Sequence, residues 1–221
     1  MIKAVFFDFD GILFDTERMW NSLESGYVIK KGYPFLADRM KFMICCDKSI
    51  DIFDVILEGY EDIIDKKEFE KDLFEYLNEV NPVTPFEDII FPDVKPILKW
   101  LKDNNYLIAC ASSSSYDYVS EGLNKADIFK YFDLIVSGRD FKRNKPHPDC
   151  YEHCMNSFNL KPDECLVVED SPNGILCGHN AGMKVVVRKD YDIGLDQRGG
   201  DYFLDSYDEL PAIIDRINNQ K

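Results

Sequence analysis

Acidic, hydroxyl and lysine side chains occur at four points of the sequence, each a short distance after an apolar run. The segments are Asp8-Phe9-Asp10-Gly11, Ser112-Ser113-Ser114-Ser115, Lys145-Pro146-His147-Pro148-Asp149 and Glu169-Asp170-Ser171. Each one alone has a plain structural explanation, such as a turn, a loop or a helix cap. Their shared placement after apolar runs indicates that they belong to one site.

Four carboxylates in this set, those of Asp8, Asp10, Glu169 and Asp170, would repel one another if they lay together without a cation. Oxygen-only ligands suit a hard divalent ion. Mg²⁺ in particular is held by a few carboxylates together with substrate phosphate. The acidic part of the set therefore predicts Mg²⁺ as a cofactor.

The remaining side chains of the set suit phosphate oxygens. Lys145 supplies a positive charge, and the hydroxyls of Ser112 and Ser113 supply hydrogen bonds. A carboxylate can also attack phosphorus and form an aspartyl-phosphate. Two carboxylates two residues apart, as in Asp8 and Asp10, could divide the roles of nucleophile and general acid/base.

The elements that must position these side chains are short strands and helices. Apolar runs predict buried strands at residues 4–7, 107–111, 134–136, 165–168 and 184–187. Helical spacing predicts helices at residues 92–104, 116–125, 148–158, 172–180 and 207–217. Alternating strands and helices predict a parallel sheet with helices on both faces. Ligands bind at the carboxyl ends of such strands, so the four segments are expected at one edge of the sheet.

One long stretch breaks the alternation. From residue 16 to about residue 86 the pattern is helical, with helices expected at residues 18–31, 49–57 and 67–80 and a linker at residues 81–85. The sequence therefore predicts an α/β core domain made of residues 1–15 and 87–221. A helical cap domain, residues 16–86, is inserted into it.

The four segments, in this order, resemble the motifs of the haloacid dehalogenase-like (HAD) superfamily of phosphotransferases. The matching residues are Asp8-Phe9-Asp10-Gly11-Ile12-Leu13-Phe14-Asp15-Thr16-Glu17, Ser112, Lys145-Pro146-His147-Pro148-Asp149 and Val168-Glu169-Asp170-Ser171-Pro172-Asn173-Gly174. The resemblance covers the sheet domain and implies a Rossmann-like parallel sheet. The insert matches less clearly and is similar to the small helical cap of β-phosphoglucomutase-like members.

The resemblance implies a role for each matching residue. Asp8 is similar to the nucleophile that takes the phosphoryl group. Asp10 is similar to the general acid for the leaving alcohol, and then the base for the attacking water. Ser112 and Lys145 are similar to the residues that bind the transferring phosphoryl group.

The same resemblance implies a Mg²⁺ site. Its ligands would be Asp8, the backbone carbonyl of Asp10, and Asp170. Glu169 would be either a further ligand or a neighbour of one. The second aspartate, Asp10, argues against dehalogenation, because haloacid dehalogenases proper do not use it.

Three insert residues are candidates for substrate contact: Glu17, Trp20 and Lys48. Trp20 stands where β-phosphoglucomutases carry a histidine that is tied to mutase behaviour, so its presence favours hydrolysis. Lys48 stands near the place of an arginine expected in a mutase, and a lysine is a weaker, point-charge contact for an anion.

The overall composition disfavours some classes of binding partner. Lys+Arg number 26 and Asp+Glu 41 in 221 residues, a formal net charge of −15, which disfavours nucleic acid and anionic membranes as partners. Seven cysteines without a regular framework indicate free thiols in a reducing cytoplasm. The short apolar start does not resemble a signal peptide. We expect a cytoplasmic monomer whose partner is a small phosphorylated metabolite.

These observations together favour a Mg²⁺-dependent phosphatase of small phosphorylated metabolites such as sugar phosphates. One alternative is a hexose-phosphate mutase of the same fold. The other is a non-catalytic metabolite-binding protein on the same scaffold. A pure binding protein has no need of both Asp8 and Asp10, which disfavours the second alternative.

Overall fold

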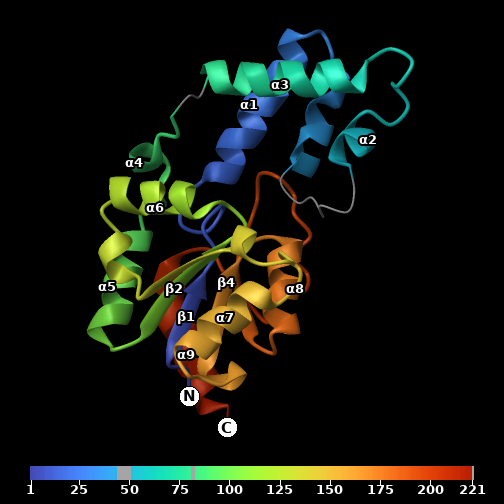
Figure 1. The fold of residues 1–221 in the computed structure, drawn as a ribbon. Coiled ribbons are helices and arrows are strands. Elements are labelled where there is room, and N and C mark those ends of the chain that lie inside the picture. The colour runs from blue at the N-terminus through green and yellow to red at the C-terminus, as the bar shows by residue number, and fades with distance from the viewer. Residues whose placement is uncertain (44–50, 81–82, 221) are drawn as a thin grey trace. The chain divides into compact units, whose positions relative to one another are not determined.

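The structure, a computed structural model, describes residues 1–43, 51–80 and 83–220. The chain divides into two compact units, whose elements are drawn in Figure 1. The sheet unit comprises Met1–Asp15 and Phe86–Lys221, and the helical unit comprises Thr16–Pro85.

A six-stranded sheet forms the centre of the sheet unit, in the order β3-β2-β1-β4-β5-β6. Its strands are β1 (Ala4–Phe7), β2 (Leu107–Ser112), β3 (Leu134–Ser137), β4 (Cys165–Glu169), β5 (Lys184–Arg188) and β6 (Tyr202–Leu204). All neighbouring strands are parallel. In the interior strand β1, Phe7 pairs with Cys110 of β2 on one side and with Val168 of β4 on the other. The predicted parallel α/β sheet is confirmed.

Helices connect these strands. They are α4 (Phe86–Ile89), α5 (Val94–Asp103), α6 (Tyr116–Lys125), α7 (Asp149–Ser157), α8 (Pro172–Asn180) and α9 (Leu210–Asn219). Serine N-caps start two of them: Ser115 Oγ accepts from the Tyr118 N–H before α6, and Ser171 Oγ accepts from the Gly174 N–H before α8. A cap of this kind satisfies a backbone donor that the helix itself leaves open.

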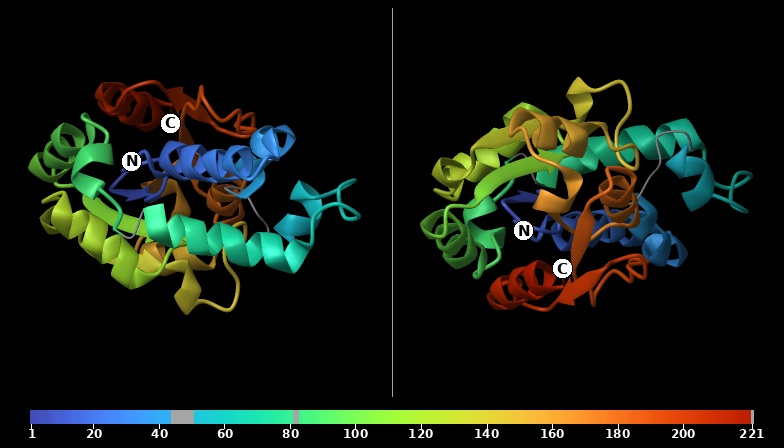
Figure 2. Two further views of the ribbon diagram at one scale, coloured as in Figure 1. Left: turned by 90° about the horizontal axis from the view of Figure 1, so that it is seen from above. Right: turned by 90° about the horizontal axis from the view of Figure 1, so that it is seen from below.

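The strands are buried on both faces. Val5 and Phe7 of β1 belong to a core formed with α5, α6 and α9, whereas Ala4 and Phe6 belong to a second core formed with α7 and α8. In both views of Figure 2, α9 (dark red) and α7 (orange) lie on opposite sides of β1 (dark blue). This double burial explains why the strands appear in the sequence as continuous apolar runs without polar alternation.

The helical unit has a core of its own. Its elements are α1 (Thr16–Lys30), a 3₁₀ segment at Pro34–Met43, α2 (Ile52–Ile56) and α3 (Lys66–Val80). Tyr27 of α1 and Phe53 of α2 both pack against Phe69 of α3, with ring centroids 5.4 and 6.2 Å away. Among the described residues of the whole chain, no helix has both the length and the apolarity needed to cross a membrane.

Two of the differences from the sequence-based expectation concern the sheet unit. The sheet has a sixth strand, β6, of only 3 residues at its edge. Phe86, which the sequence analysis assigned to the insert, lies in the sheet unit. Its ring packs there against those of Phe9 and Phe14, with centroids 5.8 and 5.1 Å away.

Candidate active site

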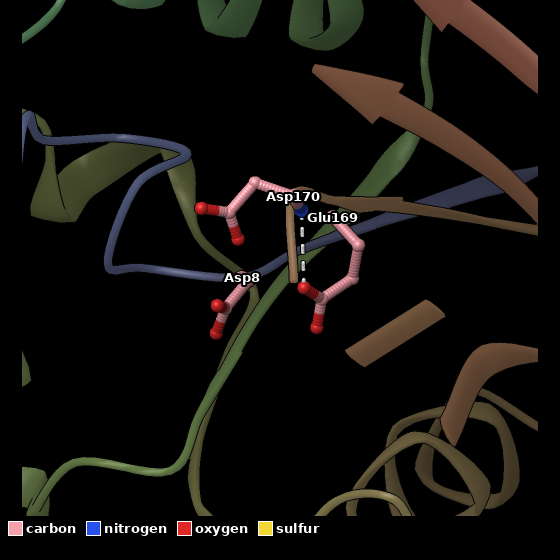
Figure 3. Close-up of side chains that lie close together, drawn as sticks. All are labelled: Asp8, Glu169 and Asp170. Atoms are coloured by element: carbon pink, nitrogen blue, oxygen red, sulfur yellow. Dashed lines mark hydrogen bonds between the residues drawn. The ribbon is translucent and has the colours of Figure 1, made fainter. Parts of the chain in front are cut away.

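Three carboxylates meet at the carboxyl ends of two neighbouring strands. Asp8 directly follows β1, Glu169 is the last residue of β4, and Asp170 comes next. The Asp8 N–H donates to the Val168 carbonyl at 3.0 Å, so the ladder between β1 and β4 continues into the site. One oxygen from each carboxylate lies within 4.8 Å of the others. Figure 3 shows the three side chains gathered there.

These carboxylates are almost completely buried, with exposed fractions of 8% for Asp8, 0% for Glu169 and 5% for Asp170. Burial first, and then the charge of Glu169, raise the pKa of Asp8 to about 8. The same two causes raise the pKa of Asp170 well above its usual range. Such a cluster is costly in the ionised form unless cations neutralise it.

Lys145 is the cation that the chain itself supplies. Its Nζ lies 2.7 Å from Asp8 Oδ1 and 2.6 Å from Glu169 Oε1, and it donates to the Ala111 carbonyl at 2.9 Å. Its side chain is only 4% exposed. Burial lowers the pKa of Lys145, but the two carboxylates outweigh this effect and the pKa rises well above its usual range. The lysine is therefore charged at neutral pH.

Asp170 has the features of a metal ligand. Within the described part of the chain, Lys145 forms its ion pairs with the other two carboxylates, those of Asp8 and Glu169. Among the described residues, Asp170 Oδ1 accepts no hydrogen bond although it is buried. A buried oxygen of this kind is costly unless it has a partner. The three carboxylates offer only oxygen ligands, and one of these oxygens has no hydrogen-bond partner among the described residues. Such a set, with the Lys145 ammonium beside it, fits Mg²⁺.

Asp10 and the serine loop after β2 form a second group. Ser114 Oγ donates to Asp10 Oδ2 at 2.9 Å, whereas the Ser112 hydroxyl lies 3.5 Å from the same oxygen. Ser112 Oγ also accepts from the Ser114 N–H. Gly11 has a φ of +70°, which turns the chain directly after Asp10. The contact between Ser114 and Asp10 was not foreseen from the sequence.

Two further residues support the site and were also missed by the sequence analysis. Asn144 Oδ1 accepts from the Lys145 N–H at 2.9 Å and from Ser113 Oγ at 3.1 Å. Tyr151 of α7 donates its hydroxyl to Glu169 Oε1 at 2.8 Å, and its ring centre lies 5.0 Å from Lys145 Nζ. Asn144 thus links two predicted phosphate-binding residues, while Tyr151 holds the carboxylate that pairs with the lysine.

The structure brings Asp8, Lys145, Glu169 and Asp170 together, and it joins Asp10 to the serine loop. Of the three candidates for substrate contact, Glu17 and Trp20 lie on α1 of the helical unit. Lys48 lies outside the described residues. Their role in substrate contact stays a prediction.

Gly174 lets α8 approach Glu169 closely. A Cβ built at Gly174 would lie 1.9 Å from Glu169 Cδ and 2.0 Å from each carboxylate oxygen. Gly174→Ala is therefore expected to displace Glu169 and with it Lys145. We expect it to lower the free energy of unfolding by about 1–3 kcal/mol, the usual cost of overpacking, and to lower kcat/KM. Denaturant unfolding and steady-state kinetics measure the two effects.

Gly26 provides the matched control for this substitution. It lies inside α1, and a Cβ there would meet only the Tyr76 hydroxyl at 3.8 Å. Gly26→Ala should raise stability by about 0.5–1 kcal/mol, because alanine favours a helix interior over glycine. If Gly174→Ala proved as harmless as Gly26→Ala, the close packing of α8 on Glu169 would not constrain the site.

Comparisons with known proteins identify the family of the chain. The family model described as haloacid dehalogenase-like hydrolase matches residues 5–188. YhcW of Bacillus subtilis, whose name describes it as a candidate phosphatase, is 30% identical over 223 residues, spanning 100% of both chains. The phosphorylated carbohydrates phosphatase of Thermotoga maritima is 27% identical over 83% of each chain.

A solved structure supports the fold. It is that of a conserved haloacid dehalogenase-like protein of unknown function from Agrobacterium tumefaciens, with a TM-score of 0.80 and 24% identity, covering 99% of this chain and 100% of that one. The family match runs from β1 to the end of β5, and so includes Asp8, Lys145 and Asp170. This confirms the resemblance that the motif order indicated: the chain belongs to the haloacid dehalogenase-like hydrolase family.

Proposed function

We propose that the protein is a Mg²⁺-dependent phosphatase that hydrolyses phosphorylated carbohydrates through an aspartyl-phosphate at Asp8. The observation that carries the proposal is the buried arrangement at the ends of β1 and β4. Lys145 Nζ lies 2.7 Å from Asp8 Oδ1, and Asp170 offers a buried oxygen with no hydrogen-bond partner among the described residues. This combination supports Asp8 as the nucleophile, Lys145 as the positive charge beside it and Asp170 as a ligand of a divalent cation.

In the first step, an oxygen of Asp8 forms a bond to phosphorus while the bond from phosphorus to the substrate alcohol oxygen breaks. Asp10 gives its proton to the departing alcohol oxygen. In the second step a water molecule attacks the phosphorus of the aspartyl-phosphate, and Asp10 takes a proton from that water. Inorganic phosphate leaves, and Asp8 regains its carboxylate.

The phosphoryl oxygens need donors throughout both steps. Lys145 already stands at the attacking carboxylate, so its charge also lies next to the group that Asp8 receives. The hydroxyl of Ser112 is 3.5 Å from Asp10, a long contact that leaves it able to donate to a phosphate oxygen. Ser113 is held through Asn144 beside Lys145. Phosphoryl transfer depends mainly on such positioning and charge compensation.

Mg²⁺, when bound, would neutralise negative charge on the transferring phosphoryl group. Asp8 and Asp170 would hold it, together with the Asp10 carbonyl, while Glu169 would be a ligand or a neighbour of one. The cluster of three buried carboxylates supports this assignment, because its fully ionised form carries more negative charge than Lys145 can neutralise.

The substrate class is proposed from the relatives. The name of the Thermotoga maritima protein specifies phosphorylated carbohydrates, and the shared chain covers 83% of that protein. Trp20, at the position where the related mutases carry a histidine, favours hydrolysis over transfer of the phosphoryl group within a sugar.

Release of phosphate from a panel of substrates tests the proposal. Sugar phosphates should release phosphate in Mg²⁺, without any sugar bisphosphate as activator. Chelation by EDTA should lower the rate to background, and added Mg²⁺ should restore it. Phosphoglycolate and pyrophosphate serve as non-carbohydrate comparisons in the panel.

Three results would contradict parts of the proposal. Isomerised sugar phosphate appearing faster than free phosphate would favour the mutase. Binding of sugar phosphates with no turnover in Mg²⁺ would favour a non-catalytic protein. Phosphate release that continues in EDTA would show that the reaction does not need the metal.

A further inference from the structure

One aspartate accepts four hydrogen bonds from the backbone of the loop between β5 and β6. Asp190 Oδ1 accepts from the N–H groups of Asp192 and Ile193, both at 3.0 Å. Asp190 Oδ2 accepts from those of Gly194 and Leu195, at 2.7 and 3.0 Å. Four consecutive backbone donors thus converge on one carboxylate. These four hydrogen bonds define the conformation of the loop, and they hold the backbone that carries its side chains in place.

The residue that this loop presents to the candidate site is Gln197. Its Nε2 donates to the Asp170 carbonyl and to the Arg188 carbonyl, at 2.8 Å each. Its Oε1 accepts from the Asp190 N–H at 2.9 Å. Both amide protons and the amide oxygen are therefore used. One side chain connects the residue after β4, the end of β5 and the start of the loop.

Asp170 depends on its backbone for orientation. Its side-chain Oδ1 accepts no hydrogen bond among the described residues, so no hydrogen bond from them fixes the position of that oxygen. Its N–H donates to Glu169 Oε2 at 3.2 Å, and its carbonyl accepts from Gln197. Two contacts thus hold the main chain from which the carboxylate projects.

We propose that Gln197 is a positioning residue for Mg²⁺, acting through the Asp170 carbonyl to aim the Asp170 carboxylate at the ion. The proposal rests on the metal site of the proposed function. Partners that orient a metal ligand without touching the metal typically change metal affinity or activity by about 10–100-fold when they are removed. Gln197 does not contact the Asp170 carboxylate in any bond described above; it holds the backbone carbonyl of the same residue, from a loop that the four motifs do not include.

A purely structural role predicts a different result. If Gln197 only fastened the loop, its loss would lower stability and leave Mg²⁺ affinity unchanged. Metal affinity must therefore be measured separately from stability. The rise in melting temperature with Mg²⁺ concentration gives the dissociation constant of the folded protein without any substrate, because a ligand that binds the folded state stabilises it by mass action.

Two variants make the test. Gln197→Met keeps the length of the side chain and removes every hydrogen bond. Gln197→Glu keeps an oxygen that can accept from the Asp190 N–H, but it replaces the two donated protons with a carboxylate that faces two carbonyls. In both, the Kd for Mg²⁺ should rise about tenfold or more. The value of kcat at saturating Mg²⁺ should largely recover, and KM for the phosphate ester should change little.

Asn218→Leu is the matched control. Asn218 is a half-buried amide like Gln197, and its Oδ1 accepts from the Ile2 N–H at 2.7 Å, before the amino end of β1. Asn218→Leu removes a comparable hydrogen bond between a side chain and the backbone, at the opposite end of the sheet. Melting temperature should fall, while the Kd for Mg²⁺ and the activity should stay at the wild-type values.

The outcomes separate this inference from the function on which it rests. If wild-type protein shows no change in melting temperature with Mg²⁺ and no activation by it, the proposed metal site fails. If the wild type binds Mg²⁺ and both Gln197 variants bind it equally well, only the positioning role fails. If neither variant folds, Gln197 is a structural residue and the positioning role is likewise rejected.

Discussion

Replacing Asp8 with asparagine is expected to lower kcat/KM for phosphate esters on the order of 10⁴- to 10⁶-fold while the fold survives. The substitution removes the attacking charge and one proposed metal ligand but keeps the shape of the side chain. The amide oxygen can still accept from Lys145 Nζ, which lies 2.7 Å from Asp8 Oδ1. Steady-state kinetics measure the loss, and circular dichroism with thermal melting checks the fold.

Asp133→Asn is a closely matched control for this substitution. Asp133 Oδ1 also lies 2.7 Å from a lysine, Lys102, and its Oδ2 accepts from the Ile108 N–H near the amino end of β2. Asp133→Asn therefore makes the same chemical change, carboxylate to amide beside a lysine, at the opposite end of the strands. Its activity should stay within about twofold, because surface ion pairs contribute little.

The covalent step has a direct readout as well. Rapid acid quench during turnover, followed by mass spectrometry, should find a phosphoryl group on the peptide that contains Asp8 in the wild type. Asp8→Asn should lack it. Retention of a tenth of the wild-type kcat by Asp8→Asn, or a phosphoryl group on another residue, would show that Asp8 is not the nucleophile.

The sheet could be predicted from the sequence because its strands are buried on both faces. Such strands require apolar residues at consecutive positions, so runs like that of β1 stand out. The edge strand β6 could not be found in this way. Its 3 residues, Tyr202–Leu204, are not a buried apolar run, because the middle residue, Phe203, is 41% exposed. Pairing with β5 defines this strand, and pairing leaves no local signal.

The same reasoning explains which parts of the candidate site were foreseen. Asp8, Glu169 and Asp170 lie within two residues of the ends of predicted strands, so the topology of a parallel sheet brings them together. Tyr151 and Gln197 do not lie at the ends of predicted strands, so the sequence gives no such signal for them. Tyr151 is one aromatic residue on a helix, and only the packing of α7 brings its hydroxyl to Glu169. Gln197 reaches Asp170 from a loop whose conformation depends on Asp190.

Asp10→Asn is expected to cost about 10²–10⁴-fold in kcat/KM for a sugar phosphate, the usual contribution of a general acid or base. Its geometry should persist, because the asparagine oxygen can still accept from Ser114 Oγ, which lies 2.9 Å from Asp10 Oδ2. The loss should be smaller for p-nitrophenyl phosphate, since that leaving group needs little protonation. Ser114→Ala, which removes only this contact, should show a weaker version of the same pattern.

The rate of the first step decides this assignment, because slow hydrolysis of the aspartyl-phosphate would mask a difference in kcat between leaving groups at steady state. A burst of p-nitrophenol in rapid-mixing experiments reports formation of the aspartyl-phosphate alone. If Asp10 is the acid, Asp10→Asn should keep a fast burst and lose the turnover that follows, because the same residue activates water in the second step. The burst with the sugar phosphate, followed as released sugar, should become slow. Equal slowing of both bursts would mean that Asp10 acts through the position of Asp8 or the metal and does not transfer a proton to the leaving group.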